Sequence, residues 1–299
     1  MPTLDALLAS RHSVVAVVTQ PDRPRGRGHK IIDAPVKARA AAASVPLFQP
    51  SRLKDPVFLD WLRGLAADLG VVAAYGKILT DEVLAMPRLG LINVHASLLP
   101  AYRGAAPVHR AVIAGEAETG VTIMRVVKAL DAGPMLASER RAIGPDDTSD
   151  VVEQDLARIG ARLLTRSVDD LAAGRAVETP QDDAAATYAH RLTKDDSHID
   201  WSQSAATIHN RIRGLHPWPH ASSFVNGRRL ILLRSSVEIG DVREPGTILN
   251  AHGDHLTVAT GEGVLRLLAV QPEGKRAMAV RDFLAGRPIS SGDRFTSTA

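Results

Sequence analysis

Three polar residues lie where apolar segments of the sequence give way to loops. Asn93 and His95 alternate with the apolar residues of 91–94, and Asp131 falls in the turn-forming segment 130–134. Because side chains alternate along a strand, Asn93 and His95 are expected to project from one face. An amide and an imidazolium can donate hydrogen bonds to the oxyanion that forms when an amine attacks a carbonyl. A neighbouring carboxylate can orient the imidazole and accept a proton through water. The set therefore predicts acyl transfer in which the incoming amine is the nucleophile.

A structural interpretation of these residues stays open at this stage. Asn and His near a strand end are more often hydrogen-bonded parts of the structure than catalytic groups. Here the pair is followed by Pro100, which ends regular structure, and later by Asp131 in a loop with Gly and Pro. This grouping favours a site, because open α/β sheets bind ligands at the carboxyl ends of their strands.

Strands and helices alternate around these residues. Apolar runs at 13–19 and 69–75 predict strands buried on both faces. Helices are predicted at residues 2–9, 35–43, 57–67, 80–85 and 106–114. A strand at 121–127, an antiparallel return at 135–141 and a long amphipathic helix that ends at Gly174 follow. The alternation predicts an α/β domain over residues 1–174, with a mostly parallel sheet and helices on both faces. No strand precedes the first helix, so we expect the first strand of such a sheet to be missing.

The last third of the chain has a different character. Residues 175–190 are polar and Ala-rich, and we predict an interdomain linker there. Short strands follow, with a hairpin signal at Asn226 and Gly227 and a short helix near the end. This pattern predicts a small OB-like β-barrel domain over residues 191–299. Such barrels commonly bind nucleic acid, although a purely structural barrel has the same pattern.

The composition limits the classes of function. The 299 residues include no cysteine, which excludes disulfides and thiolate chemistry and favours a cytoplasmic setting. There is no signal-peptide pattern, and no apolar run approaches the roughly 20 residues of a membrane span. No P-loop and no Gly-x-Gly-x-x-Gly follows a strand, which disfavours nucleotide triphosphate and nicotinamide enzymes. Two prolines between His216 and His220 prevent the helix that would aim both at a metal, so none is expected.

Basic residues are concentrated in two places. The net charge is +3, and residues 191–299 carry 14 Lys and Arg against 11 Asp and Glu, which permits a polyanionic partner. Residues 20–30 combine prolines and glycines with four cations, which predicts a loop. The cations are Arg23, Arg25, Arg27 and Lys30. They suit either a solvated surface or a phosphate backbone, since Arg offers forked donors.

Three motifs resemble the folate-dependent formyltransferases: INVHASLLP at 92–100, YRGAAPV at 102–108 and LDAGPM at 130–135. The resemblance implies a Rossmann-like catalytic domain with 10-formyltetrahydrofolate as co-substrate and no metal. It implies catalytic roles for Asn93, His95 and Asp131. It also implies that Ser97, Leu98, Leu99 and Pro100 line the folate site.

Further segments resemble the members of that family that act on tRNA. They are TQPDRPRGRGHK at 19–30, LTKDDSHIDW at 192–201, IRGLHPWPHA at 212–221 and QPEGKRAM at 271–278. The resemblance implies that Arg23, Arg25, Arg27 and Lys30 bind initiator tRNA with help from the OB-like domain. It also implies a cytoplasmic monomer that formylates the amino group of methionine on that tRNA, for translation initiation. The family's first strand and Gly-Thr-Pro loop are expected to be missing here, and His109 stands where members often have Trp.

Two alternatives remain open. One is a formyl-folate transferase acting on a small amine, such as a sugar nucleotide or glycinamide ribonucleotide. That enzyme is expected to lack both the basic loop and the C-terminal domain. The other is a non-catalytic RNA-binding relative, which the missing strand favours and the intact Asn93, His95 and Asp131 set disfavours.

Overall fold

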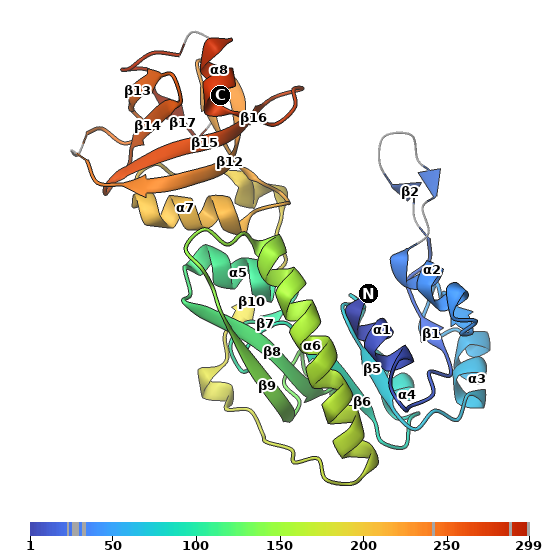
Figure 1. Ribbon diagram of the computed structural model, residues 1–299. Coiled ribbons are helices and arrows are strands. Elements are labelled where there is room, and N and C mark those ends of the chain that lie inside the picture. The colour runs from blue at the N-terminus through green and yellow to red at the C-terminus, as the bar shows by residue number, and fades with distance from the viewer. Residues whose placement is uncertain (23, 26–29, 32–33, 241–242, 287–288, 298–299) are drawn as a thin grey trace. The chain divides into compact units, whose positions relative to one another are not determined.

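The computed structural model describes most of the chain in two compact units (Figure 1). The described residues are 1–22, 24–25, 30–31, 34–240, 243–286 and 289–297. The first unit comprises Met1–Ala105, Gly120–Arg141 and Gln154–Tyr188, and the second comprises Ala106–Thr119, Ala142–Glu153 and Ala189–Ala299. Because the units interleave along the chain, the domain boundaries predicted at 174 and 190 remain predictions.

Helices and strands alternate along the first 188 residues. The helices are α1 Pro2–Leu8, α2 Pro35–Ala42, α3 Pro56–Gly64, α4 Asp81–Leu84, α5 Pro107–Ala114 and α6 Ser149–Ala172, with a short 3-10 helix η1 at Asp183–Ala185. The strands are β1 Val17–Val18, β2 Pro24–Arg25, β3 Lys30–Ile31, β4 Leu47–Phe48, β5 Gly70–Val72, β6 Leu91–His95, β7 Arg103–Gly104, β8 Glu118–Arg125 and β9 Met135–Ala142. The helices predicted from the sequence are present, each within a few residues of its predicted bounds.

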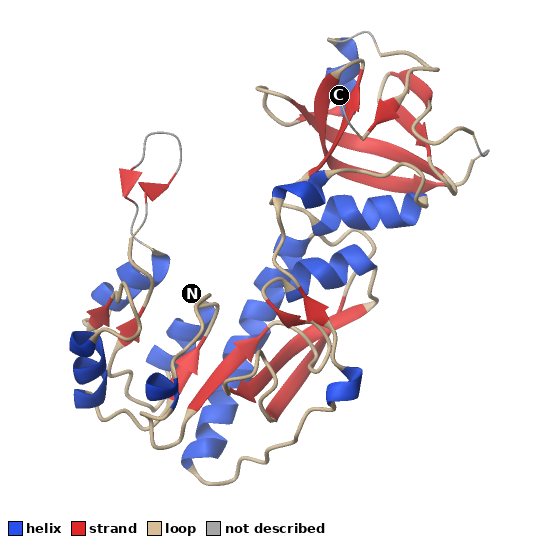
Figure 2. Ribbon diagram, turned by 180° about the vertical axis from the view of Figure 1, so that it is seen from behind, coloured by secondary structure: helices blue, strands red, loops and turns tan. Residues whose placement is uncertain are grey.

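The central sheet has the strand order β5-β6-β8-β9. Strands β5 and β6 are parallel, and β6 and β8 are antiparallel. A separate parallel pair joins β1 to β4. Helix α6 lies along one face of the central sheet, and the view from behind shows the strands in front of it (Figure 2). Gly160 of α6 permits this approach, because a Cβ there would lie 2.8 Å from Val94 and 3.2 Å from Val121.

Two expected core strands are shorter and more exposed than predicted. The run at 13–19 forms a strand only at Val17–Val18, and Val15 is 43% exposed. The run at 69–75 forms a strand only at Gly70–Val72, and its residues are partly exposed. The prediction that both are buried on two faces is therefore wrong. Each is an outer strand of its sheet among the described residues, so one edge has no neighbouring strand to cover it.

The chain from residue 188 onward is dominated by one antiparallel sheet. Its strands are β11 Ala221–Val225, β12 Arg228–Glu238, β13 Ile248–His252, β14 His255–Ala259, β15 Val264–Pro272, β16 Met278–Ala279 and β17 Phe295–Thr296. The other elements are β10 Tyr188–Ala189, the 3-10 helix η2 Lys194–Ser197, and the helices α7 Ala205–Gly214 and α8 Val280–Ala285. The strand order is β13-β14-β15-β12-β11-β17, with β16 paired to β15.

The sheet curls so that its outer strands approach each other. An antiparallel bridge joins Thr247, just before β13, to Arg294, just before β17. The predicted hairpin turn is confirmed, with φ of 50° at Asn226 and 69° at Gly227. The predicted fold class, a Rossmann-like α/β domain followed by a small β-barrel-like domain, is confirmed. In the part of the chain that is described, no helix is long and apolar enough to cross a membrane.

Phe295 anchors the last strand to the core of this sheet. Its side chain is 1% exposed, and its ring centroid lies 5.1 Å from that of Trp201. We expect Phe295→Ala to lower the free energy of unfolding by about 3–5 kcal/mol, because it removes the ring and leaves a cavity. Urea unfolding measures the change. The matched control is Val237→Ala at a side chain that is 49% exposed, and an equal loss in both variants would contradict the assignment.

Two histidines lie close together between α7 and β11. The ring centroids of His216 and His220 are 5.2 Å apart. Burial, and next the neighbouring His216, lower the pKa of His220 below its usual value of 6.5. The unfolded chain therefore takes up this proton before the folded chain does, and stability falls as the pH drops from the usual pKa toward the lowered one.

We therefore expect His220→Asn to reduce the loss of melting temperature between about pH 7.5 and about pH 5.5. Asn is chosen because residue 220 has a φ of 64°, which Asn tolerates better than most residues. Thermal unfolding at the two pH values gives the comparison. The control is His252→Asn at an exposed histidine. If His220→Asn loses as much melting temperature as the unmodified protein, the expectation is wrong.

Candidate active site

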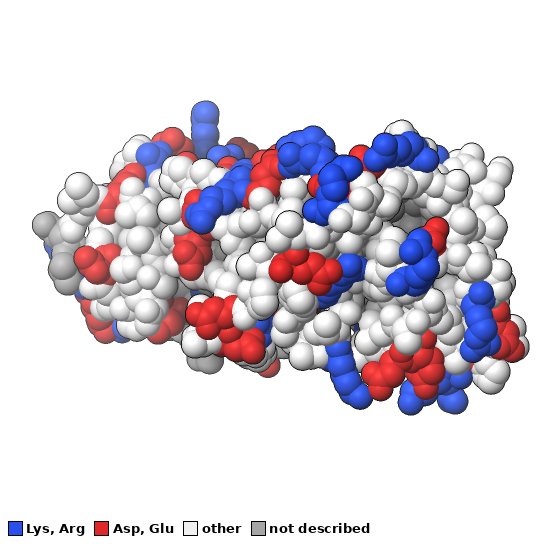
Figure 3. All heavy atoms as spheres, turned by 90° about the horizontal axis from the view of Figure 1, so that it is seen from below, with Lys and Arg blue, Asp and Glu red and all other residues white. Residues whose placement is uncertain are grey.

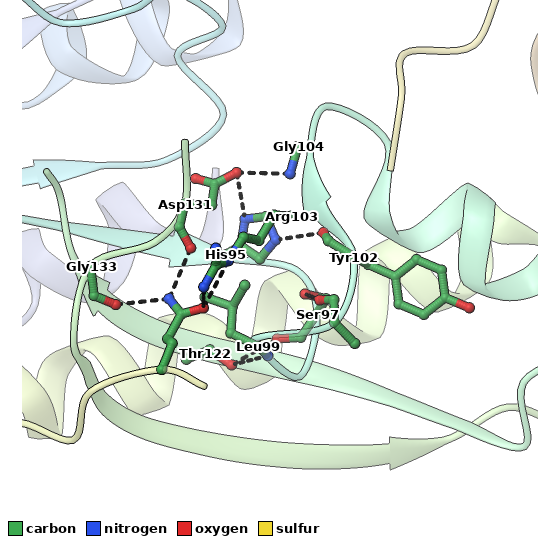
Figure 4. A network of polar contacts seen from close by, with 11 residues as sticks. His95, Ser97, Leu99, Tyr102, Arg103, Gly104, Thr122, Asp131 and Gly133 are labelled. Carbon is green, nitrogen blue, oxygen red and sulfur yellow. Dashed lines mark hydrogen bonds and ion pairs between the residues drawn. The ribbon is translucent and has the colours of Figure 1, made fainter. Parts of the chain in front are cut away.

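Two of the predicted catalytic residues meet at the end of β6 (Figure 4). His95 is the last residue of β6, and Asp131 lies in the connection between β8 and β9. The Nδ1 atom of His95 is 3.7 Å from Oδ2 of Asp131. Both side chains are largely buried, at 5% and 16% exposure. The structure therefore brings together an imidazole and a carboxylate that are far apart in the sequence.

The ring of His95 is held from both sides. Its Nε2 atom lies 3.0 Å from the carbonyl oxygen of Tyr102. Because a carbonyl only accepts, the proton in this bond belongs to Nε2, which leaves Nδ1 facing Asp131. Any oxyanion that His95 binds must therefore displace one of these two contacts.

Asp131 adopts an unusual backbone conformation for a residue with a side chain, with a φ of 47°. Its Oδ2 atom accepts a hydrogen bond of 2.9 Å from the backbone N–H of Gly104. Gly133, two residues later, has no room for a side chain, since a Cβ there would lie 1.9 Å from the carbonyl oxygen of Arg125. The loop thus depends on close backbone packing.

Asn93 lies two residues before His95 on β6. It pairs with Met124 of β8, and its side chain is partly exposed. The spacing of two places Asn93 and His95 on the same face of the strand, as the sequence predicts. Asn93 is thus a polar group with accessible surface beside a largely buried His95.

The segment predicted to line the folate site has two kinds of residue. Ser97 and Leu99 are buried, at 0% and 7% exposure, whereas Leu98 and Pro100 are partly exposed. The Ser97 hydroxyl donates to the Ala101 carbonyl at 2.6 Å. The Thr122 hydroxyl donates to the Ser97 carbonyl at 2.8 Å and accepts from the Leu99 N–H at 3.2 Å. Ser97 and Leu99 therefore fix the shape of the loop, and Leu98 and Pro100 present its surface.

The predicted tRNA-binding cations are described only in part. Arg23 and Arg27 lie outside the described residues. Arg25 in β2 pairs with Lys30 in β3 in a short antiparallel strand pair, of which only the backbone is described. The prediction of a loop over 20–30 is therefore corrected for the described residues of β2 and β3, because their backbones pair as antiparallel strands.

Basic side chains elsewhere are largely balanced by acids. On α6, Arg162 and Arg166 pair with Glu139, and Arg158 pairs with Asp155. On the face drawn in Figure 3, Lys and Arg side chains are interspersed with Asp and Glu. Charge on that face therefore does not single out a site for a polyanion.

Two residues near the site were not identified from the sequence. Arg103 is a buried arginine within YRGAAPV, and Gln181 lies in the predicted linker. The Arg103 guanidinium donates two hydrogen bonds to the Gln181 Oε1 atom, from Nε at 3.0 Å and from Nη2 at 2.9 Å. Arg103 lies within the YRGAAPV motif, and that position could have indicated it. The polar composition of residues 175–190 gives no indication of a role for Gln181.

Comparison with known proteins identifies the class. The sequence matches the family described as Formyl transferase over residues 2–168, and Formyl transferase, C-terminal domain, over residues 191–288. The chain therefore belongs to the formyl transferase family.

Within that family, the sequence is similar to the methionyl-tRNA formyltransferases. It is 45% identical over 294 residues to the one from Moorella thermoacetica, which covers 98% of this chain and 94% of the relative. It is 46% identical over 291 residues to the one from Methylococcus capsulatus, which covers 97% and 94%. The family members that the sequence motifs resemble are thus confirmed as close relatives.

Solved structures share the fold at low sequence identity. One is the N-formyltransferase from Helicobacter canadensis in complex with folinic acid and dTDP-3-aminofucose, with a TM-score of 0.67, 16% identity, and coverage of 90% of this chain and 94% of that one. Another is HypX from Aquifex aeolicus in complex with tetrahydrofolic acid, with a TM-score of 0.61, 16% identity, and coverage of 82% and 43%. These likenesses support the fold class.

Proposed function

We propose that this chain transfers the formyl group of 10-formyltetrahydrofolate to the amino group of methionine on initiator methionyl-tRNA, for translation initiation. The observation that carries the proposal is 45–46% identity to methionyl-tRNA formyltransferases over nearly the whole length of both chains. The placement of His95 beside Asp131 also supports it, because a carboxylate there can orient the imidazole and accept the amine proton through water.

The side chains divide the work of the reaction. The methionine amine attacks the formyl carbon, and the carbonyl electron pair moves to its oxygen. The Asn93 amide and a ring N–H of His95 donate hydrogen bonds to that oxyanion, where one donor typically contributes about 100- to 1,000-fold. Asp131 orients His95 and accepts the amine proton through water. Collapse of the intermediate breaks the bond to the folate nitrogen, and the proton passes to that nitrogen.

The co-substrate and the tRNA are assigned to different segments. Leu98 and Pro100 provide surface for the folate, and buried Ser97 and Leu99 hold their loop in place. Arg23, Arg25, Arg27 and Lys30, together with the C-terminal sheet, bind RNA phosphates through contacts that weaken as salt rises. The enzyme acts as a cytoplasmic monomer, and its residues require no metal.

A small-amine acceptor is the second candidate, because an N-formyltransferase solved in complex with dTDP-3-aminofucose shares the fold over 90% of this chain. The test supplies 10-formyltetrahydrofolate with methionyl initiator tRNA, uncharged initiator tRNA or an amino-sugar nucleotide. We expect formyl product only with methionyl-tRNA. Turnover of the sugar alone would replace the proposal with the second candidate. Binding of tRNA without turnover of any acceptor would indicate a non-catalytic relative.

A further inference from the structure

Gln181 contacts the loop that carries Asp131, although it lies in the polar segment predicted as a linker. Its Nε2 atom donates to the carbonyl oxygens of Asp131 and Gly133, at 2.8 Å each. Two hydrogen bonds of 2.8 Å between the backbones of Thr179 and Met135 hold the segment beside the start of β9. Gln181 therefore holds the backbone of the loop at two positions, Asp131 and Gly133.

The orientation of the Gln181 amide is set by Arg103. The guanidinium donates from Nε and Nη2 to Oε1 of Gln181, at 3.0 and 2.9 Å, and Nη2 also contacts Asp183 at 2.7 Å. Because Oε1 accepts from the guanidinium, the amide nitrogen must face the two loop carbonyls. The Arg103 side chain is 4% exposed, so its guanidinium lies largely away from water, whereas the Asp183 side chain is 82% exposed.

The residues on either side of Arg103 also contact the pair directly. The Tyr102 carbonyl accepts from His95, and the Gly104 N–H donates to Asp131 (Figure 4). Residues 102–104 thus hold His95 directly, Asp131 directly, and the Asp131 loop through Gln181. A φ of 47° at Asp131 is a sparsely populated conformation that persists only where its surroundings hold it.

We propose that Gln181, oriented by Arg103, is a positioning residue that fixes the Asp131 carboxylate against His95 for formyl transfer. The inference rests on the proposed function and deepens it, since the segment after α6 then belongs to the working site. Gln181 acts through Asp131, so its loss misplaces the carboxylate. A misplacement of about 1 Å in an active site costs on the order of 100-fold in rate.

The test compares Gln181→Glu with Asp182→Asn, its neighbour. Gln181→Glu keeps an oxygen for Arg103 but removes both donors to the loop carbonyls, and Asp182 is exposed. We expect Gln181→Glu to lower kcat by roughly 10- to 100-fold with KM for methionyl-tRNA changed less than about threefold. Asp182→Asn should keep both values. An unchanged kcat in folded Gln181→Glu, or an equal loss in both variants, would overturn the proposal.

Two further measurements separate positioning from general structure. In an Asp131→Asn background, Gln181→Glu should lower kcat little further, because the residue acts through Asp131. If the double variant instead lost kcat by the product of the two single-variant factors, the proposal that Gln181 acts through Asp131 would be contradicted. Crystal structures of the unmodified protein and Gln181→Glu should show the His95 Nδ1 to Asp131 Oδ2 separation increased from 3.7 Å, and an unchanged separation would overturn the proposal. This last readout does not use activity, so it distinguishes failure of the positioning role from failure of the proposed function.

Discussion

Replacing Asp131 by Asn is expected to lower kcat for formyl transfer by about 100- to 10,000-fold, the range that a proton-transferring group contributes. The amide keeps the shape of the side chain, and its oxygen still accepts from the Gly104 N–H. It removes the charge that lies 3.7 Å from Nδ1 of His95, and it cannot accept the amine proton. Substrate binding should change little, because the proposed role of the carboxylate is on the reacting groups.

Steady-state kinetics with both substrates varied separates kcat from KM. Asp60→Asn is the matched control, since Asp60 lies on α3 and its side chain is 75% exposed. Melting temperatures of the two variants should stay close to that of the unmodified protein. A kcat of Asp131→Asn within twofold of the unmodified value would remove Asp131 from the reaction.

Gly133→Ala is expected to abolish formyl transfer and to lower the melting temperature. The added Cβ would lie 1.9 Å from the carbonyl oxygen and 2.8 Å from the carbonyl carbon of Arg125. Both are backbone atoms, so no side-chain rotation relieves the overlap. The loop must shift, and the shift moves Asp131 and the Gly133 carbonyl that Gln181 contacts.

Gly64→Ala provides the control for this prediction. Gly64 ends α3, and nothing lies within 4 Å of the position of an added Cβ. Its substitution should be neutral or slightly stabilising, because Ala restricts the unfolded chain more than Gly does. Thermal unfolding and activity are measured for both variants. Unmodified stability and activity in Gly133→Ala would show that the loop is not packed against Arg125 as described.

Local features of the structure were predictable from the sequence. The turn at Asn226 and Gly227 follows from residue type, because few residues accept positive φ. The shared face of Asn93 and His95 follows from the alternation of side chains in a strand. The approach of Asp131 to His95 was inferred from a loop after a strand and from the family resemblance, and the structure places the two side chains in contact.

Features that depend on remote partners were not predictable. Gln181 is recognised by Arg103, 78 residues earlier, and no periodicity in a polar segment indicates such a pairing. The strands β16 and β17 are only two residues long, too short for their own sequences to show a strand pattern. They are strands because they pair with β15 and β11. The exposure of Val15, which precedes the two-residue strand β1, is likewise not indicated by its apolar sequence.

The most direct test of the account is single-turnover formylation of methionyl initiator tRNA by His95→Ala, with 10-formyltetrahydrofolate saturating. His95 is predicted to hold the oxyanion and to contact Asp131, so the rate should fall by at least about 100-fold. The dissociation constant for tRNA should stay within about threefold, because RNA binding is assigned to the cations of residues 23–30 and to the C-terminal sheet. A single-turnover rate within twofold of the unmodified protein would contradict the assignment of formyl transfer to this site.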